Sequence, residues 1–182
     1  SLNYRTILLG TFFITVVFDL TLAVEIGMAL ASLFFIYRMS DLTRIDRVPL
    51  EDFYGVEALS HADGTPRIVA YKLKGSLFFG AANKLENLLL GLPGHPEVVV
   101  LDLDKVINID TTGLDILQTL HRNLQKRGAH LVLCGLNSQP GSIVFRSGFS
   151  DKLGDDNITA NLTEALIRAQ RLGGREPEIS YT

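Results

Sequence analysis

Apolar residues divide this chain into two parts of different character. Within residues 7–37 the only charged side chains are Asp19 and Glu25. A globular core rarely contains so long an apolar run, whereas about 20 apolar residues span a bilayer. Residues 20–37 alone give 18 positions, or roughly 27 Å of helix against a hydrocarbon thickness of ~30 Å. The pattern therefore predicts a helix that crosses a membrane.

The apolar stretch before Asp19 is shorter. Residues 7–18 provide 12 positions, too few to cross a bilayer upright. We expect two helices that turn near Asp19 and form a membrane hairpin over residues 1–38; one long tilted helix that carries both acids is the alternative. Because the chain opens with Ser1 instead of Met, we expect it to be a fragment of a longer protein.

Charges that flank the apolar run predict its orientation. Arg5 precedes the run, and Arg38, Arg44 and Arg47 follow it. Since positive residues gather on the cytoplasmic side, both ends of the hairpin and the part that follows are expected in the cytoplasm. A cleavable signal sequence is a poorer interpretation, because no Ala-x-Ala-like site follows the apolar run.

Two acids, Asp19 and Glu25, lie within the predicted membrane segment. A carboxylate at membrane depth is costly, which makes each acid a candidate functional residue. Glu25, however, lies close to the start of its helix, where it can reach the interface or pair within a helix bundle. We favour this second, structural role for Glu25.

The remaining chain, about 130 residues, is long enough for one domain with its own core. Residues 98–103 form a near-continuous apolar run, typical of a strand covered on both faces. A helix is expected at 112–127, because one helical face there repeats Leu114, Leu117, Leu120 and Leu124. Further strands are expected at 67–74, at 130–134 and within 49–59, and further helices at 81–90, 142–147 and 162–171.

This order of elements predicts an α/β domain with at least partly parallel strands. Right-handed crossovers would place the helices largely on one face of the sheet. We expect the domain to cover residues 49–172. Residues 39–48 are expected to be a linker, and residues 173–182 a mobile tail.

The loop between the strand at 98–103 and the following helix carries the most distinctive chemistry. It presents an acid and two hydroxyls in Asp110, Thr111 and Thr112, followed by Gly113. Binding sites of α/β domains concentrate at such strand-to-helix junctions. Thr111 or Thr112 suits the N-cap position of the helix, and a plain helix cap is the alternative explanation of the whole motif.

The sequence Asp-Thr-Thr-Gly at 110–113 resembles the Asp-Ser/Thr-Ser/Thr-Gly signature of STAS domains, which SulP anion transporters and anti-sigma-factor antagonists share. The resemblance runs from about Arg67 to Leu172. It includes residues 75–81, Gly-Ser-Leu-Phe-Phe-Gly-Ala, which are similar to a segment typical of transporter-attached members. It implies a sheet of four to five strands with helices mainly on one face, preceded here by a transmembrane hairpin, as at the end of SulP transporters.

Composition excludes several function classes. The formal net charge of −3 gives no support to nucleic-acid binding. Cys134 lies in an apolar strand and is expected to be a buried hydrophobe instead of a nucleophile. The four histidines are scattered, and neither a Walker-type loop nor a metal-ligand spacing is present, so we expect no metal and no cofactor.

An enzymatic role is also disfavoured. The loop with Thr112 contains no histidine or lysine that could act as a base. Asp102 and Asp104 are nearby, and three acids next to two threonines could bind a divalent cation, but Mg²⁺ sites normally borrow substrate phosphates. Lys74 or His121 in reach of the loop would reopen the enzymatic interpretation.

The resemblance implies the C-terminal part of a SulP-like secondary anion transporter, multi-pass in the inner or plasma membrane, with a cytoplasmic STAS domain that serves assembly or regulation. Its expected partners are the rest of the membrane domain, a second protomer in a homodimer, and the lipid bilayer. Phe78, Phe79 and Gly80 are candidate interface or nucleotide contacts, with ordinary core packing as the alternative for the two aromatic rings. The other interpretation is a stand-alone antagonist-like protein that is switched by phosphorylation of Thr112, next to Asp110.

Overall fold

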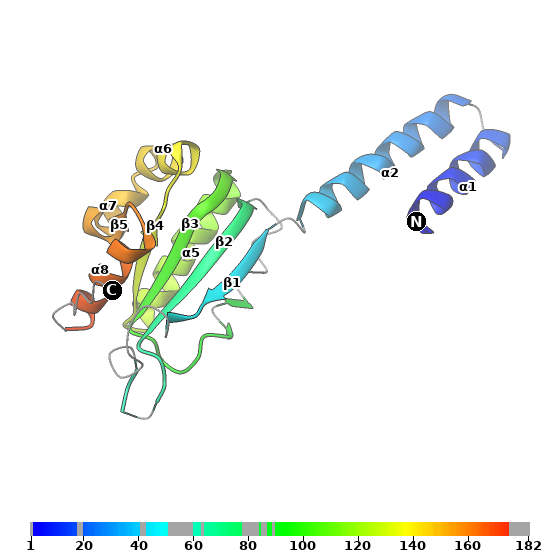
Figure 1. The fold of residues 1–182 in the computed structure, drawn as a ribbon. Coiled ribbons are helices and arrows are strands. Elements are labelled where there is room, and N and C mark those ends of the chain that lie inside the picture. Colours follow the sequence, from blue (N-terminus) through cyan, green and yellow to red (C-terminus); the bar gives the residue numbers. More distant parts are fainter. Residues whose placement is uncertain are drawn as a thin grey trace. The chain divides into compact units, whose positions relative to one another are not determined.

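The computed structural model describes residues 2–17, 20–40, 43–50, 60–62, 64–77, 84, 87–88 and 90–174. The chain divides into two compact units, Ser1–Asp41 and Leu42–Thr182 (Figure 1). Each unit has its own internal packing and is described separately. The boundary lies at the end of the apolar part, where the sequence predicts a change of environment.

The first unit is a pair of helices, α1 (Leu2–Val17) and α2 (Leu20–Ser40), that run antiparallel side by side (Figure 1). Ala23 is buried on α2, and a Cβ added at Gly27 would lie 3.6 Å from the Thr11 hydroxyl of α1. Two helices therefore form, as expected, instead of one long helix. Asp19 lies outside the described residues.

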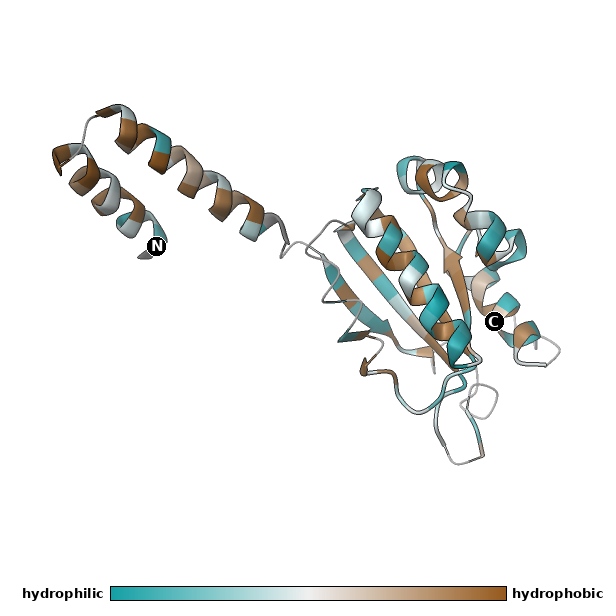
Figure 2. Cartoon of the chain, turned by 180° about the vertical axis from the view of Figure 1, so that it is seen from behind, coloured by the Kyte–Doolittle hydropathy of each residue, from teal (hydrophilic) through white to brown (hydrophobic). Residues whose placement is uncertain are grey.

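Both helices are built largely of apolar residues (Figure 2), and most of their large apolar side chains are exposed. Among the described residues, the segment Leu20–Arg38 of α2 is long and apolar enough to cross a membrane, and the apolar part of α1, Asn3–Val17, is shorter. A helix that is apolar all round needs an apolar environment on every side. This unit therefore lacks a polar face to present to water.

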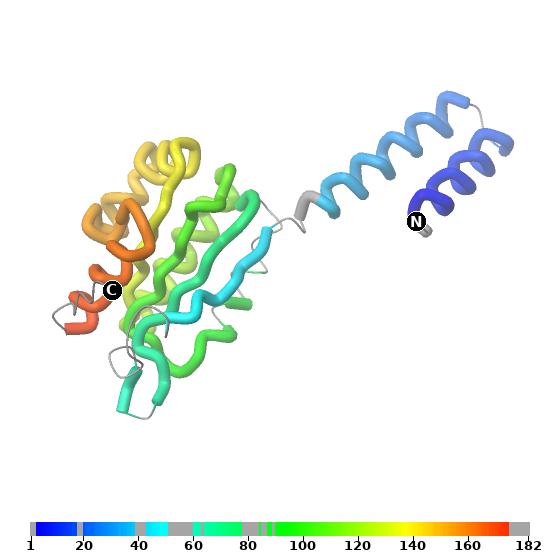
Figure 3. The backbone as a smooth tube through the Cα atoms, in the orientation of Figure 1, coloured from blue at the N-terminus to red at the C-terminus, as the bar shows by residue number. Residues whose placement is uncertain are grey.

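The second unit contains one five-stranded sheet in the order β1-β2-β3-β4-β5. The strands are β1 (Arg44–Val48), β2 (Ile68–Leu77), β3 (Val98–Ile109), β4 (His130–Cys134) and β5 (Ile158–Thr159). β1 pairs antiparallel with β2, and all later neighbours are parallel. The strands thus follow one another across the sheet in chain order (Figure 3).

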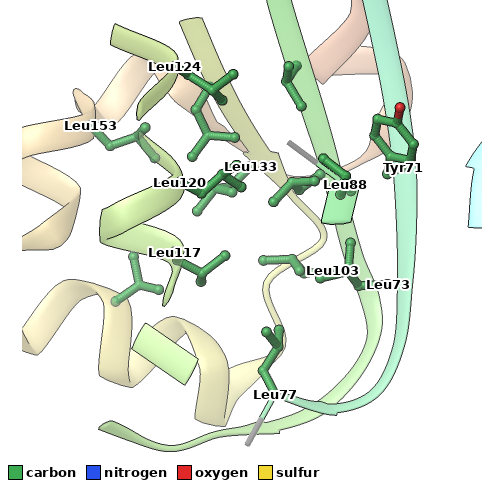
Figure 4. Packing of buried hydrophobic residues seen from close by; sticks show 14 of the residues in the cluster. Tyr71, Leu73, Leu77, Leu88, Leu103, Leu117, Leu120, Leu124, Leu133 and Leu153 are labelled. Atoms are coloured by element: carbon green, nitrogen blue, oxygen red, sulfur yellow. The ribbon is translucent and has the colours of Figure 1, made fainter. Parts of the chain in front are cut away.

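Helices cover both faces of this sheet. The larger core packs α5 (Thr111–Lys126), α6 (Ser138–Arg146) and α7 (Phe149–Leu153) against one face (Figures 1 and 4). The smaller core packs α8 (Leu162–Leu172) against the other. A short 3-10 helix, η3 (Asp155–Asn157), leads into β5. The predicted α/β sheet with helices mainly on one face is confirmed, and α8 is the helix on the opposite face.

The predicted linker at 39–48 is wrong for its second half, because Arg44–Val48 form the edge strand β1. Ile45 packs against the larger core and Val48 against the smaller one. The Asp46 carboxylate accepts a hydrogen bond from Lys74 Nζ of β2 at 2.8 Å. A short edge strand with charged outward side chains has the composition of a linker, and only its pairing with β2 distinguishes the two.

Other boundaries differ in instructive ways. β2 and β3 extend beyond the predicted 67–74 and 98–103, because polar residues of β3 beyond Leu103 continue to pair with β2. α6 begins at Ser138, earlier than the predicted 142, because Pro140 lies in the first helical turn, where its missing N–H is not needed.

The predictions for 130–134 and 162–171 are confirmed to within one residue, and the helix predicted at 112–127 is shifted by one. The strand expected within 49–59 and most of the helix expected at 81–90 lie outside the described residues. The same is true of the tail beyond residue 174.

Leu120 on α5 is almost fully buried in the larger core. Replacing it by alanine removes buried methyl groups and leaves a cavity, so Leu120→Ala should lower the free energy of unfolding of residues 42–182 by about 2–5 kcal/mol. Urea unfolding followed by circular dichroism measures this change. Ile107→Ala at an exposed position is the control and should change stability by less than about 0.5 kcal/mol; equal effects would contradict the assignment of the core.

Candidate functional site

The loop singled out in the sequence lies between the end of β3 at Ile109 and the start of α5 at Thr111. Asp110 is the N-cap of α5: its backbone is extended, with φ −95° and ψ −178°, and its Oδ1 accepts a hydrogen bond from the Gly113 amide at 2.7 Å. The prediction of a threonine cap is therefore wrong. Thr111 is already part of the helix, so Asp110, the residue before it, occupies the N-cap position. The negative charge of the Asp110 carboxylate is also stabilised by the positive end of the helix dipole.

Gly113 explains why the motif ends in glycine. A Cβ built at this position would overlap the carbonyl oxygen of Leu77 and lie 3.0 Å from its carbonyl carbon. The same carbonyl accepts a hydrogen bond from the Asp110 amide at 3.3 Å. The first turn of α5 therefore rests directly on the last residue of β2, and any side chain at 113 would separate them.

The side chains of Asn137 and Gln139, which lie on the other side of the loop, were not predicted from the sequence as part of the site. Gln139 of α6 receives a hydrogen bond from the Ile109 amide at 2.9 Å and donates one to the Ile109 carbonyl at 3.0 Å. Asn137 Nδ2 donates to the carbonyls of Asp104 at 2.8 Å and Val106 at 3.1 Å. Because β4 pairs with β3 only as far as Asp102, these side chains satisfy the backbone of β3 beyond that point. Two amide residues shortly after a buried strand were the available signal.

The hydroxyl-bearing residues of the loop are exposed. Thr111 and Thr112 are the first two residues of α5, and both lie at the surface, whereas Asp110 is half-buried. The loop therefore presents two hydroxyls on a rigid backbone that β2, β3 and α6 hold from three sides. This arrangement suits recognition or modification by another protein.

The groups that could have acted as bases are engaged elsewhere. Lys74 pairs with Asp46. His121 comes nine residues after Thr112, about 13 Å along the α5 axis, and its ring lies edge-on to Phe149 at 5.9 Å between centroids. Lys74 is thus engaged at β1, and the His121 ring packs against Phe149 of α7.

The acids near the loop are also paired. Asp102 is buried, its Oδ2 lies 2.9 Å from Lys72 Nζ, and its Oδ1 accepts from the Asp104 amide. The Asp104 carboxylate lies 3.0 Å from Lys105 Nζ. The described residues contain no group of three or more His, Cys, Asp or Glu side chains arranged to hold a metal ion.

Cys134 is fully buried on the α8 side of β4. Burial raises the pKa of its thiol to about 12, with the Asp102 carboxylate adding to the effect. The thiol therefore stays protonated at neutral pH, and a protonated buried thiol is a poor nucleophile. The prediction of a buried, unreactive cysteine is confirmed.

Three further candidates, Phe78, Phe79 and Gly80, lie outside the described residues. Glu25 is exposed on α2. Since residues two apart on a helix are separated by about 200°, Glu25 faces away from Ala23 and from the contact with α1. The structure thus leaves this carboxylate available to groups outside the hairpin.

A family model for the STAS domain matches residues 60–165, more than half of the chain. The chain belongs to the STAS domain family. The putative sulfate transporter YvdB of Bacillus subtilis is 34% identical over 153 residues, which are 84% of this chain and 28% of YvdB. The chain likewise spans 25% of Sulfate transporter 1.2 of Arabidopsis thaliana, at 27% identity in an alignment of 167 residues that covers 79% of this chain. It therefore corresponds to between a quarter and three tenths of these relatives.

Solved structures agree with this assignment. A sulfate transporter family protein from Wolinella succinogenes superimposes with a TM-score of 0.56 at 30% identity and covers 59% of this chain and 88% of its own. The murine Solute Carrier 26 family member A9 anion transporter matches 91% of this chain and 28% of its own, with a TM-score of 0.67. Because the sequence identity of this match is only 16%, the match shows a common fold and no more. The predicted resemblance to SulP transporters is confirmed by these relatives.

The seat of α5 on β2 can be tested at Gly113. Gly113→Ala should destabilise residues 42–182 by about 1–3 kcal/mol, because the added methyl group overlaps backbone that cannot move without breaking the β2–β3 pairing. Gly141→Ala is the matched control: its Cβ would meet nothing closer than 3.8 Å in α6, so stability should stay equal or rise by up to about 1 kcal/mol. The midpoints of urea unfolding measure the stability of both variants. Similar losses of stability in the two variants would refute the proposed contact.

His121 should make stability depend on pH. Burial lowers the pKa of its imidazole from the ordinary 6.5; contact with the Lys152 backbone acts in the opposite direction, and nearby His130 adds to the lowering. The unfolded chain thus takes up a proton more readily than the folded one, so stability should fall as the pH drops from 6.5 towards the lowered value. Unfolding midpoints at pH 7.5 and 5.5 measure this loss.

The variant His121→Gln should show a smaller loss between the two pH values, because the titrating group is gone. His130→Gln, at an exposed position, is the control and should keep most of the loss. An undiminished pH dependence in His121→Gln would show that another group is responsible.

Proposed function

We propose that this chain is the C-terminal part of a SulP-like secondary anion transporter, in which the STAS domain serves assembly or regulation of transport and not catalysis. The alignment with YvdB carries this proposal. It covers 153 residues, more than the second unit holds, and must therefore include part of the apolar helical unit. The similarity to a transporter therefore covers both the STAS domain and part of the apolar helical unit.

The first unit supports a multi-pass membrane location. The segment Leu20–Arg38 has the length and hydropathy of a membrane span, and α2 carries the basic residue Arg38 in its last turn. By the positive-inside rule this end faces the cytoplasm, so the STAS domain that follows is cytoplasmic too. α1 (Leu2–Val17) is the shorter arm of the hairpin, and Glu25 on the outer side of α2 meets other helices of the membrane domain or the interface.

The loop Asp110–Gly113 supports a role in recognition. Its hydroxyls are exposed on a backbone held in place, while the nearby acids, lysines and histidine are engaged elsewhere. We infer that this loop contacts the remainder of the membrane domain, a second protomer, or a regulatory protein. The transported anion is bound by earlier membrane helices, where helix termini can face it.

Regulation by phosphorylation of Thr112 is the second candidate. Thr112 is exposed and is the second residue of α5, so a phosphate there would lie at the positive end of the helix dipole. Asp110 would repel it. The apolar unit and the transporter relatives argue against a stand-alone antagonist. A phosphorylation switch at Thr112 would therefore belong to a transporter.

Membrane partitioning tests the proposal. The full chain should stay with membranes after an alkaline carbonate wash, whereas a chain without residues 1–41 should be a soluble folded domain. The truncation stops before Arg44 because β1 begins there. A full chain that is soluble and monodisperse would refute the membrane assignment.

A charge in the middle of α2 sharpens this test. Leu30→Lys should weaken membrane retention, since a lysine at the centre of a span costs about 2.5–3.5 kcal/mol on insertion. Leu90→Lys places the same charge at an exposed position in the second unit and should leave retention unchanged. Equal retention of both variants would argue against a spanning α2.

A further inference from the structure

A cavity of about 310 Å³ lies on the α5 side of the sheet, near the C-terminal end of that helix. Its lining includes His121 and Gln125 of α5, Leu131 of β4, Leu153 of α7 and Asn157 of η3. Gln125 is exposed, so the cavity reaches the surface at that residue. Nothing in the proposed function uses this cavity or the histidine in its wall.

His121 is buried in the cavity wall, with 8% of its surface exposed. Its ring contacts the backbone of Lys152 and lies edge-on to Phe149, so it touches α7 through both a polar and an apolar contact. Within the described part of the chain, its buried Nδ1 has no hydrogen-bond partner. A neutral imidazole has one N–H to place, whereas an imidazolium has two. Protonation therefore leaves an N–H group buried without an acceptor, which is costly.

The charged groups around the ring give an imidazolium little support. Burial is the main cause of the lowered His121 pKa, and His130, the side chain that acts on it through its charge, adds to the lowering. Charged side chains of the elements around the ring lie at the surface: Arg122 and Lys126 of α5, Asp151 and Lys152 of α7, Asp155 and Asp156 of η3, and His130 of β4. Access to water is therefore what a protonated ring lacks in this position.

The element that closes over His121 is short and lies between two glycines. α7 has five residues, and Gly148 before it and Gly154 after it have φ values of 68° and 89°. η3 follows and leads into the edge strand β5, which pairs with β4 only through Ile158 and Thr159. Short elements with few pairings open at low free energy. The two glycines are positions at which the backbone can change direction.

We propose that protonation of His121 releases the α7–η3 segment (residues 149–157) from α5, by rotation at Gly148 and Gly154, and that the ring then reaches water through the adjoining cavity. In the open form, water accepts both N–H groups of the imidazolium. Phe149 and Leu153 are buried in the closed form, so the closed form stays the major one and acid raises the population of the open form. The fold thus contains a pH-sensitive element beside the edge strand β5.

The size of the effect has an upper limit. In the open form the imidazole has its ordinary pKa of 6.5, whereas burial lowers its pKa in the closed form. The closed form is therefore favoured fully above pH 6.5 and loses this advantage as the pH falls towards the lowered value. Between pH 7.5 and 5.5 the open population should rise by at most about tenfold.

Hydrogen–deuterium exchange of the full chain in non-ionic detergent, followed by mass spectrometry, tests the proposal. Exchange rates at pH 7.5 and 5.5 are corrected for the intrinsic pH dependence of amide exchange. Amides of residues 149–157 should lose protection by up to about tenfold at pH 5.5, whereas those of residues 98–103 in the centre of β3 should keep theirs. Equal losses in both segments would show general destabilisation and overturn the local release. Unchanged protection of residues 149–157 would overturn it as well.

Two variants assign the effect to one ring. His121→Gln keeps a polar side chain that does not titrate, so residues 149–157 should show the same protection at both pH values. His130→Gln removes the neighbouring exposed histidine and should retain most of the loss. An undiminished loss in His121→Gln would overturn the proposal, and if this variant does not fold, the comparison of the two segments in the unaltered chain decides. The test is independent of the proposed function, because both segments belong to the second unit.

Discussion

The second unit is built around β3, whose first six residues are buried on both faces of the sheet. Val99, Leu101 and Leu103 face the larger core, while Val98 and Val100 face the smaller one. A strand covered on both faces requires helices on both, which α5 to α7 and α8 supply. The same strand then runs beyond its neighbour β4 and delivers Asp110 to the surface, so the core and the candidate site depend on one element.

Hydrogen bonds on both sides of the end of β3 hold the backbone of the site in place. On one side, the carbonyl of Leu77 receives the Asp110 amide and leaves room only for glycine at 113. On the other, Gln139 completes both hydrogen bonds of Ile109, as a neighbouring strand would. The backbone is held on both sides while the threonine hydroxyls remain exposed. Such a site is suited to being recognised, because its polar surface is presented without a cost in ordering.

The relatives match different parts of the chain. The family model covers the domain alone, whereas the alignment with YvdB also reaches the apolar helices. In the chain, the end of α2 at Ser40 and the start of β1 at Arg44 are close together.

The sequence by itself determined the elements whose signal is local: the apolar helices, the buried strands at 98–103 and 130–134, the leucine face of α5, and the Asp-Thr-Thr-Gly motif. It could not choose the N-cap, because Asp110, Thr111 and Thr112 are all good caps, and the choice depends on where β3 stops pairing with β2. It also took β1 for a linker and missed Asn137 and Gln139. These features exist only through partners distant in the chain, and tertiary structure decided them because a backbone hydrogen bond or a close approach needs both groups in place.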